Sequence, residues 1–426
     1  MRATPYELQV ATPLPSLHVT PDDAVTNPEM DDRLPPTPSL GLILVANFLF
    51  NVSFYIIVPT ATLYSRSLGA SDLYSGLVIG GITLTSAASL VPLNNVACFR
   101  DYYQPPLDLA AGTMVLGHLL YAFANVADSL ALLLLGRLVN GLGFTGWLFV
   151  KRYCTDPRIV GFRRRTMCAN LLVAAQTLGM VCGPLAGSLL SRLETSSRIW
   201  TGYTAPGFVM ALLWLLYWVT VRVYFNDAPP RTSEDLKNIS NAKLWHLDAA
   251  SLRSLLTMAV ASFVIFFVLG AWEADIPLAT DELWGWSSFS AGVLLAVGGL
   301  VSFALILPFT MYTKRIQDRA VLATALSLAL VGAVMHQSTV GAPSTLTLGG
   351  SWFFVCWGMN LDALSDKAAI VIQLSNYSGR LTGAVWGTAA SSVGGEAVVG
   401  WLNLGVNALS LTLLLCNWRV LLAHTG

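Results

Sequence analysis

The sequence predicts an all-α membrane protein of about twelve transmembrane helices in two six-helix bundles. Hydrophobic residues make up 54% of the 426 residues, and charged residues make up only 11%. An ordinary soluble domain carries roughly 25% charged residues. Apolar stretches of about 18–25 residues, the length that crosses a bilayer, recur along the chain. A polar stretch divides them into two sets of six, the layout of a transporter built from two helical bundles.

The elements follow in chain order. Residues 1–38 contain eight prolines, six acids and no apolar core of a signal peptide, so we expect a disordered cytosolic tail. We then expect an N-terminal bundle over 39–225, a cytosolic linker over 226–252 and a C-terminal bundle over 253–422. The expected helices cover 40–61, 73–94, 107–126, 129–150, 166–190, 204–224, 253–274, 288–310, 319–337, 345–363, 382–400 and 402–422.

The distribution of basic residues predicts the orientation. With both termini in the cytosol, the cytosolic segments hold 20 of the 24 Lys and Arg residues. Three arginines fall on the other side, and Arg137 falls inside a span. This excess fits the positive-inside rule. The acidic residues Glu273, Asp275, Asp281 and Glu282 are expected in and beside a loop on the opposite face.

Arg137 is the main candidate for substrate contact. It lies within the run LLLLGRLVNGLGFTG of the fourth span, where a charge is costly unless it is solvated or paired. The first-half spans supply no acidic residue at this depth. One interpretation is that an anionic substrate pairs with Arg137 in a water-filled cavity. The alternative is that it caps backbone carbonyls and holds helices together.

Two carboxylates are candidates for proton coupling or gating. Glu273 is expected at the end of the seventh span, and Glu396 in or beside the eleventh. A carboxyl group at membrane depth can bind and release protons near physiological pH. The alternatives are an interfacial carboxylate and a helix-end residue. His118 in the third span is expected to be a hydrogen-bonded core residue more than a proton relay.

Small residues form a helix-packing motif in the fourth and fifth spans. Glycine lets neighbouring backbones approach closely in lipid, which suits two bundles that rock against each other as well as simple tight packing. The residues are Gly141, Gly143, Gly179, Gly183, Pro184 and Gly187.

Several functional classes are not indicated. The six cysteines are scattered, and no Walker loop, Rossmann fingerprint, catalytic triad or metal-ligand cluster occurs. We therefore expect neither an enzyme nor a cofactor or metal. The net charge is zero, so no basic field for nucleic acid exists. The expected partners are the lipid bilayer, a small or inorganic anion, and protons.

The runs GRLVNGLG and GMVCGPLAG resemble the fourth- and fifth-span motifs of the major facilitator superfamily. The resemblance implies a major facilitator-type fold and transport by alternating access. The opening NVSFYIIVPTATLYSRSLGASDLYSGLVIG is similar to that of the SPX-containing vacuolar phosphate transporters. Asn360, Leu361, Tyr377 and Gly379 also match that branch. A related lysosomal branch resembles the second half, from Glu273 to Leu322.

That resemblance implies an anion substrate such as phosphate and favours a vacuolar or lysosomal-type membrane, while the composition leaves the plasma membrane as an alternative. The sequence departs from the branch in three ways: the 38 residues before the first span are expected to be too few for an SPX domain, the arginines after the span-four glycines are reduced to Lys151 and Arg152, and Ser391 or Ser392 stands where the eleventh span is expected to carry an arginine. Arg137, Lys151 and Asn360 are thus the substrate-binding candidates. The alternatives are a transporter of a neutral or cationic solute and a non-transporting receptor or scaffold.

Overall fold

The computed structural model describes residues 32–193, 197–229, 249–310, 317–363 and 370–425, and the described part contains helices and no β-strand. The first group of helices is α2 (Thr37–Tyr55), α3 (Ala61–Ser67), α4 (Asp72–Asn94), α5 (Ala97–Asp101), α6 (Gln104–Phe123), α7 (Leu130–Phe144), α8 (Gly146–Thr155), η1 (Phe162–Arg164), α9 (Arg165–Ser191) and α10 (Ala205–Tyr224). The second group is α12 (Ala249–Trp284), α13 (Ser288–Thr310), α14 (Asp318–Gly341), α15 (Thr345–Ala363), α16 (Ile370–Gly394), α17 (Glu396–Cys416) and α18 (Trp418–Thr425).

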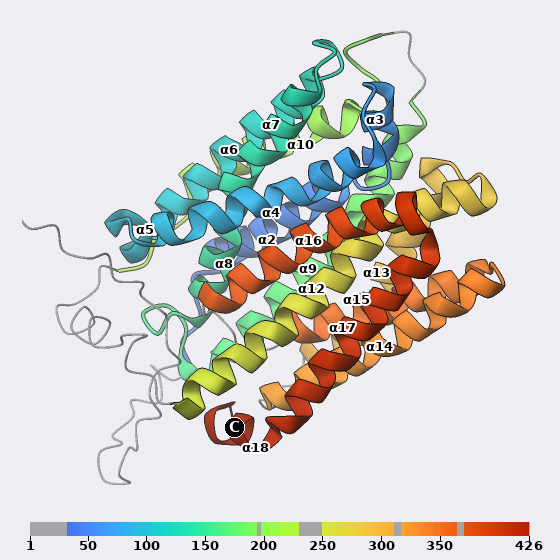
Figure 1. The fold of residues 1–426 in the computed structure, drawn as a ribbon. Coiled ribbons are helices and arrows are strands. Elements are labelled where there is room, and N and C mark those ends of the chain that lie inside the picture. The colour runs from blue at the N-terminus through green and yellow to red at the C-terminus, as the bar shows by residue number, and fades with distance from the viewer. Residues whose placement is uncertain (1–31, 194–196, 230–248, 311–316, 364–369, 426) are drawn as a thin grey trace, which may run out of the picture.

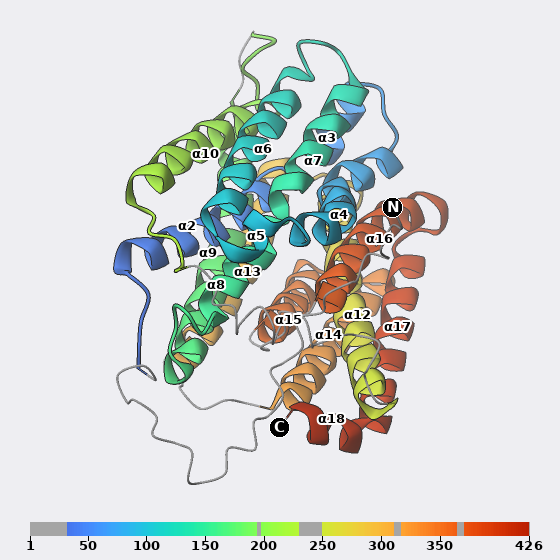
Figure 2. The same ribbon diagram turned by 90° about the vertical axis from the view of Figure 1, so that its left-hand side faces the viewer.

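The long helices run side by side in two groups, the blue-to-green α2–α10 and the yellow-to-red α12–α17 (Figures 1 and 2). The short helix α3 lies at one end of the bundle, and α5 and α18 lie at the other. We call these the α3 end and the α18 end. The all-α fold class is confirmed. The division into domains stays a prediction, and most of the predicted linker, 230–248, lies outside the described residues.

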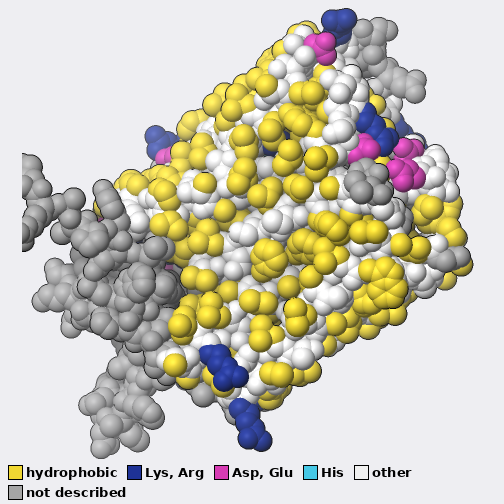
Figure 3. All heavy atoms as spheres, in the orientation of Figure 1, with side chains coloured by type: hydrophobic (Ala, Val, Ile, Leu, Met, Phe, Trp, Pro, Cys, Tyr) yellow, Lys and Arg dark blue, Asp and Glu magenta, His cyan; other side chains and the backbone are white. Residues whose placement is uncertain are grey.

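Within the described residues, ten helices are long and apolar enough to cross a membrane. Apolar side chains cover the middle of the face shown in Figure 3, while many of its charged side chains gather toward the two ends. Such a surface suits a hydrocarbon environment between two polar layers. Two further long helices, α15 and α16, complete the expected twelve, although they are less apolar than the other ten.

The eleventh and twelfth spans were predicted too far along the chain. The eleventh is α16, which begins at Ile370 instead of 382, and the twelfth is α17, which begins at Glu396. The first half of α16 carries Gln373, Asn376 and Arg380, so its hydropathy is too low for an apolar-run criterion. The helix is nonetheless shielded, because it packs between α12 and α4.

Glycines hold α16 against α12. A Cβ atom on Gly379, Gly383 or Gly387 would lie 2.1–2.4 Å from a backbone carbonyl oxygen of α12. No larger side chain fits at such a separation, so the two backbones are in direct contact. This contact sets Arg380 beside the middle of α12.

Two other helices also differ from expectation. The seventh span does not end near residue 274, because α12 continues to Trp284. Glu273 and Asp275 are therefore buried within the helix instead of lying at its end or in a loop. The first span ends early, at Tyr55, and a turn that contains Pro59 leads into α3. Proline lacks the N–H that would continue the helix.

Candidate functional site

The centre of the molecule contains a buried ion pair between α12 and α16. Arg380 donates to Glu273 through Nε to Oε2 at 3.0 Å and through Nη2 to Oε1 at 2.6 Å. Tyr55 at the end of α2 donates its hydroxyl to the same Oε1 at 2.5 Å. All three side chains are at most 3% exposed. The carboxylate therefore joins the two groups of helices.

Arg380 is the residue that the sequence interpretation missed. It was counted with the cytosolic basic residues, because the eleventh span was predicted to begin at 382. The eleventh span thus carries an arginine at position 380, whereas the resemblance implied one at the place of Ser391 or Ser392. A usable signal was present: Gly379, Gly383 and Gly387 recur every fourth residue, which is typical of a packed membrane helix.

Arg137 lies in the middle of α7 and is fully buried. Its Nε donates to the carbonyl of Val78 on α4 at 3.0 Å, and Nη1 donates to the carbonyl of Ser53 on α2 at 3.4 Å. Its Nη2 has no hydrogen-bond partner among the described residues. The side chain thus caps carbonyls, as one interpretation expected, and keeps one free donor.

Both arginines approach the ring of Phe54 on α2. The guanidinium carbon of Arg380 lies 3.4 Å from the ring centroid, and that of Arg137 lies 5.8 Å from it. Cations favour the face of an aromatic ring. The two arginines and Glu273 give formal charges of +1, +1 and −1, so the cluster carries a net +1. We call Arg137, Arg380, Glu273, Tyr55 and Phe54 the central cluster.

Further unpaired polar atoms lie where α6 meets α7. Neither ring nitrogen of His118 and neither amide atom of Asn140 has a hydrogen-bond partner among the described residues, although both side chains are fully buried. The expectation of a hydrogen-bonded core histidine is therefore wrong. Unpaired buried polar groups are rare, and they often mark a site for water or an ion.

The other predicted substrate residues lie elsewhere. Lys151 is on α8, with its ammonium 4.7 Å from the ring centroid of Trp147. It is 14 residues beyond Arg137, or about 21 Å along a helix. Asn360 on α15 accepts a hydrogen bond from Thr177 on α9 at 2.6 Å, which joins the two groups of helices. The structure therefore does not bring Lys151 to the central cluster.

Glu396 is the first residue of α17, and its side chain lies outside the described residues. The helix-packing residues lie at close helix contacts. A Cβ atom on Gly141 would lie 2.3 Å from the carbonyl oxygen of Ile82, and one on Gly187 would lie 2.0 Å from that of Ile56. Gly143 packs on α6, Gly179 and Gly183 pack on α2, and Pro184 lies inside α9.

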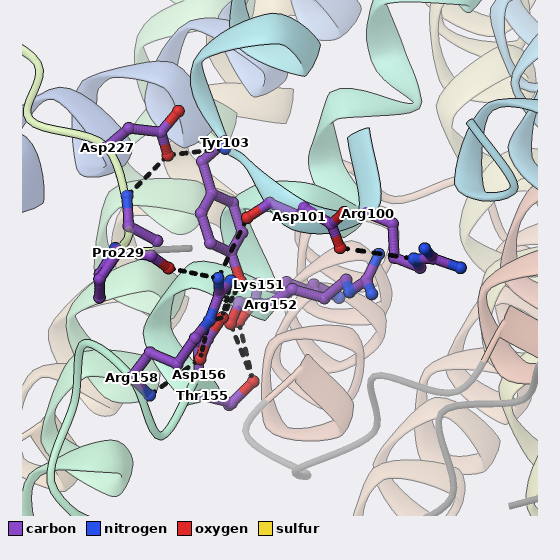
Figure 4. A network of polar contacts seen from close by, with 11 residues as sticks. Arg100, Asp101, Tyr103, Lys151, Arg152, Thr155, Asp156, Arg158, Asp227 and Pro229 are labelled. Atoms are coloured by element: carbon purple, nitrogen blue, oxygen red, sulfur yellow. Dashed lines mark hydrogen bonds and ion pairs between the residues drawn. The ribbon is translucent and has the colours of Figure 1, made fainter. Parts of the chain in front are cut away.

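A polar network near Lys151 links three segments at the α18 end (Figure 4). The Asp156 carboxylate accepts from Arg158 Nη2 at 2.7 Å and from the Tyr103 hydroxyl at 2.7 Å. Arg158 also donates to the carbonyl of Pro229 at 2.7 Å, and Asp227 accepts from the backbone N–H of Tyr103 at 2.8 Å. These contacts fix the chain that leaves α10.

We expect Asp156→Asn to lower the free energy of unfolding by about 1.5–3 kcal/mol, the range for a buried hydrogen bond to a charged group. Burial alone would raise the pKa of Asp156, but its hydrogen bonds with Arg158 and Tyr103 outweigh burial and lower that pKa. The contribution is thus fully present above about pH 4, near the unfolded-state pKa, and is lost as pH falls through the folded-state pKa.

Unfolding of the purified protein and of Asp156→Asn, measured from neutral pH down to acid pH, checks this expectation. The difference between the two should stay constant between about pH 7 and 5 and shrink only near or below pH 4. A difference that already disappears at pH 6 would contradict the assignment to Asp156.

Residues 43–400 match the family described as the Major Facilitator Superfamily. An uncharacterized MFS-type transporter of Schizosaccharomyces pombe is 30% identical over 321 residues, covering 72% of this chain and 64% of that protein. A second such transporter of this yeast is 29% identical over 93% of this chain and 84% of its own length. An SPX domain-containing membrane protein of Arabidopsis thaliana is 29% identical over 92% of this chain and 64% of its own length.

The chain thus spans less than two thirds of the first and third of these relatives. Among solved structures, the crystal structure of the human organic anion transporter MFSD10 (TETRAN) superposes with a TM-score of 0.65. The superposition covers 88% of this chain and 99% of the human chain at 13% identity. At that identity the likeness concerns the fold.

Proposed function

Because the chain belongs to the Major Facilitator Superfamily, we propose that it is a secondary transporter of a small anion, with inorganic phosphate as the first candidate substrate. The observation that carries this proposal is the net charge of +1 in the central cluster. A buried positive charge without a protein counter-ion is costly, and an anion removes that cost. A cationic solute would add to it.

The Arg380–Glu273 pair suggests how an anion binds. A carboxylate that accepts two N–H bonds from one guanidinium has nearly the geometry of a phosphate group on arginine. In this proposal the Glu273 carboxylate accepts the hydrogen bonds of the Arg380 guanidinium when substrate is absent. An arriving anion then replaces the carboxylate, and the free Nη2 of Arg137 supplies a second donor. Protonation of Glu273 would favour the exchange.

Alternating access needs one end of the cavity closed at a time, and contacts between the two groups of helices occur at the α3 end. Arg66 on α3 lies 3.6 Å from Asp281 on α12. A Cβ atom on Gly292 of α13 would lie 1.8 Å from Ser188 Oγ of α9. These contacts support a conformation that is closed at the α3 end. Substrate would enter and leave from the α18 end.

The α18 end carries the basic residues Arg100, Lys151, Arg152 and Arg158 around the polar network. We propose that this end faces the cytosol, as the positive-inside rule requires. Both termini then lie in the cytosol. A vacuolar or lysosomal-type membrane is the favoured location, on the resemblance to the SPX-containing branch.

Flux into proteoliposomes tests the function. Purified full-length protein should take up labelled phosphate with saturation, and unlabelled phosphate should compete better than sulfate or chloride. Uptake should rise when a pH gradient is imposed if Glu273 takes part. A folded, correctly inserted protein that carries no anion would overturn the proposal. Uptake of a neutral or cationic solute would then support the corresponding alternative.

A further inference from the structure

The fourth span is interrupted between the central cluster and the α18 end. The helix α7 ends at Phe144, and α8 begins at Gly146. The backbone N–H of Leu148 donates to the carbonyl of Thr145 at 3.1 Å, whereas a continuous α-helix would pair it with the carbonyl four residues back. That carbonyl belongs to Phe144, and the interruption makes it available to a donor from outside the span.

The second group of helices supplies this donor. Tyr377 on α16 is 1% exposed, and its hydroxyl donates to the Phe144 carbonyl at 3.1 Å. The rings of the two residues also lie close, with centroids 6.1 Å apart. Trp147 on α8 packs on Phe144, and its ring lies 6.5 Å from that of Phe266 on α12. Two aromatic contacts therefore connect the interrupted span to the second group.

These aromatic contacts lie on the α18 side of the central cluster. Phe144 is seven residues beyond Arg137 in the fourth span, and Phe266 is seven residues before Glu273 on α12. Seven residues correspond to about 10 Å along a helix. Both directions lead to the α18 end. The start of α12 is hydrogen-bonded to Asn417, just before α18, whereas the start of α7 is hydrogen-bonded to α4 near α3.

A second hydrogen bond between the two groups lies at a similar depth. The hydroxyl of Thr177 on α9 lies 2.6 Å from Oδ1 of Asn360 on α15, and both side chains are fully buried. Thr177 is six residues, or about 9 Å, before Gly183, which packs on Tyr55 of the central cluster. Because α9 begins at Arg165, just after the polar network of the α18 end, Thr177 also lies on the α18 side of that cluster.

Contacts of this kind suit a gate. An apolar layer of aromatic side chains opposes the passage of a charged solute, which would have to lose its hydration. A single hydrogen bond contributes little net stability, so it can break and re-form. At the α3 end the groups are joined by other contacts, such as the ion pair of Arg66 and Asp281. The α18 side can therefore open while those contacts stay in place.

We propose that Phe144, Trp147, Phe266 and Tyr377 form an inner gate between the central cluster and the α18 end, held closed by the hydrogen bond from Tyr377 to the Phe144 carbonyl. The second hydrogen bond, between α9 and α15, supports the same closed position. Lys151, four residues beyond Trp147, then lies outside the gate. With the α3 end also closed, the central cluster is enclosed, as in an occluded step of alternating access. The role of the gate in anion movement rests on the proposed function.

Spin-label distances test the gate without substrate. The exposed cysteines Cys98 on α5 and Cys416 at the end of α17 lie at the α18 end, one in each group of helices. With the other four cysteines replaced by alanine, labels on these two report how far apart the groups are. Tyr377→Phe removes only the gate hydroxyl. We expect it to raise the ratio of open to closed molecules about threefold to tenfold, the effect of one lost hydrogen bond.

Tyr64→Phe is the matched control. The Tyr64 hydroxyl is also buried and donates to a backbone carbonyl, that of Tyr121, at 3.2 Å, but both residues belong to the first group. This variant should keep the wild-type distances. Thr177→Val, a second variant, should shift them in the same direction as Tyr377→Phe. Wild-type distances in both gate variants, in preparations that thermal unfolding shows to be folded, would overturn the proposal.

Cross-linking tests the role of the gate in transport, with phosphate as the probe. Phe144→Cys and Tyr377→Cys are combined in a chain without the native cysteines and joined by a short reducible bifunctional thiol reagent. Because each cycle requires the gate to open, phosphate uptake should fall about tenfold or more and recover on reduction. Full uptake by the cross-linked protein would refute this role. If wild type carries no phosphate, the proposed function fails and the spin-label distances alone decide the gate.

Discussion

Arg380→Gln is expected to abolish anion uptake and to lower the free energy of unfolding by about 3–5 kcal/mol, the cost of leaving a buried charge unpaired. The unpaired charge is that of Glu273, which is fully buried and would keep only the Tyr55 hydroxyl as partner. No side chain other than an arginine at position 380 can supply the same two N–H donors.

The double variant Arg380→Gln with Glu273→Gln separates stability from function. Removing both charges should restore most of the lost stability, because uncharged side chains of similar size no longer require an ion partner. Uptake should remain abolished, since the anion loses its ligand. Unfolding in detergent and uptake into proteoliposomes are measured on the same preparations.

A matched control is Arg222→Gln. Arg222 forms an ion pair with Asp108 at 2.9 Å, but its side chain is 61% exposed. Exposed pairs contribute about 0–1 kcal/mol, so both stability and uptake should stay close to wild type. Undiminished uptake by Arg380→Gln would show that Arg380 does not bind substrate.

Arg137→Ala is expected to reduce uptake about 100-fold, equivalent to about 2.7 kcal/mol of transition-state binding. The variant loses both the free Nη2 and half of the positive charge around Phe54. It also loses the hydrogen bonds to the carbonyls of Val78 and Ser53. Arg137→Lys keeps the charge and should retain part of the uptake.

The half-saturation concentration distinguishes the two roles of Arg137. If the guanidinium binds the anion, Arg137→Ala raises the phosphate concentration needed for half-maximal uptake. If it only joins α7 to the carbonyls of α2 and α4, the variant unfolds more easily while that concentration stays the same. The second result would leave Arg380 as the one arginine of the central cluster that binds the anion.

The sequence by itself was sufficient for the membrane class, most of the helices and the buried position of Arg137. These depend on runs of apolar residues, because the length that crosses a hydrocarbon layer is a local property of the chain. The superfamily could also be predicted from the sequence, since the motifs GRLVNGLG and GMVCGPLAG are short and continuous. Lys151 became a candidate beside Arg137 through the family resemblance, which does not say whether the two side chains meet.

Only the tertiary structure decided which polar residues meet. Arg380 and Glu273 are 107 residues apart, and Asn360 and Thr177 are 183 apart, so no local pattern pairs them. Mean hydropathy measures how well a helix surface suits lipid. The low hydropathy of α16 is tolerated because α4 and α12 shield this helix from lipid. The predicted start of the eleventh span was too late for this reason, and Arg380 was therefore left outside the span. A polar helix can cross a membrane when neighbouring helices, instead of lipid, surround its charge.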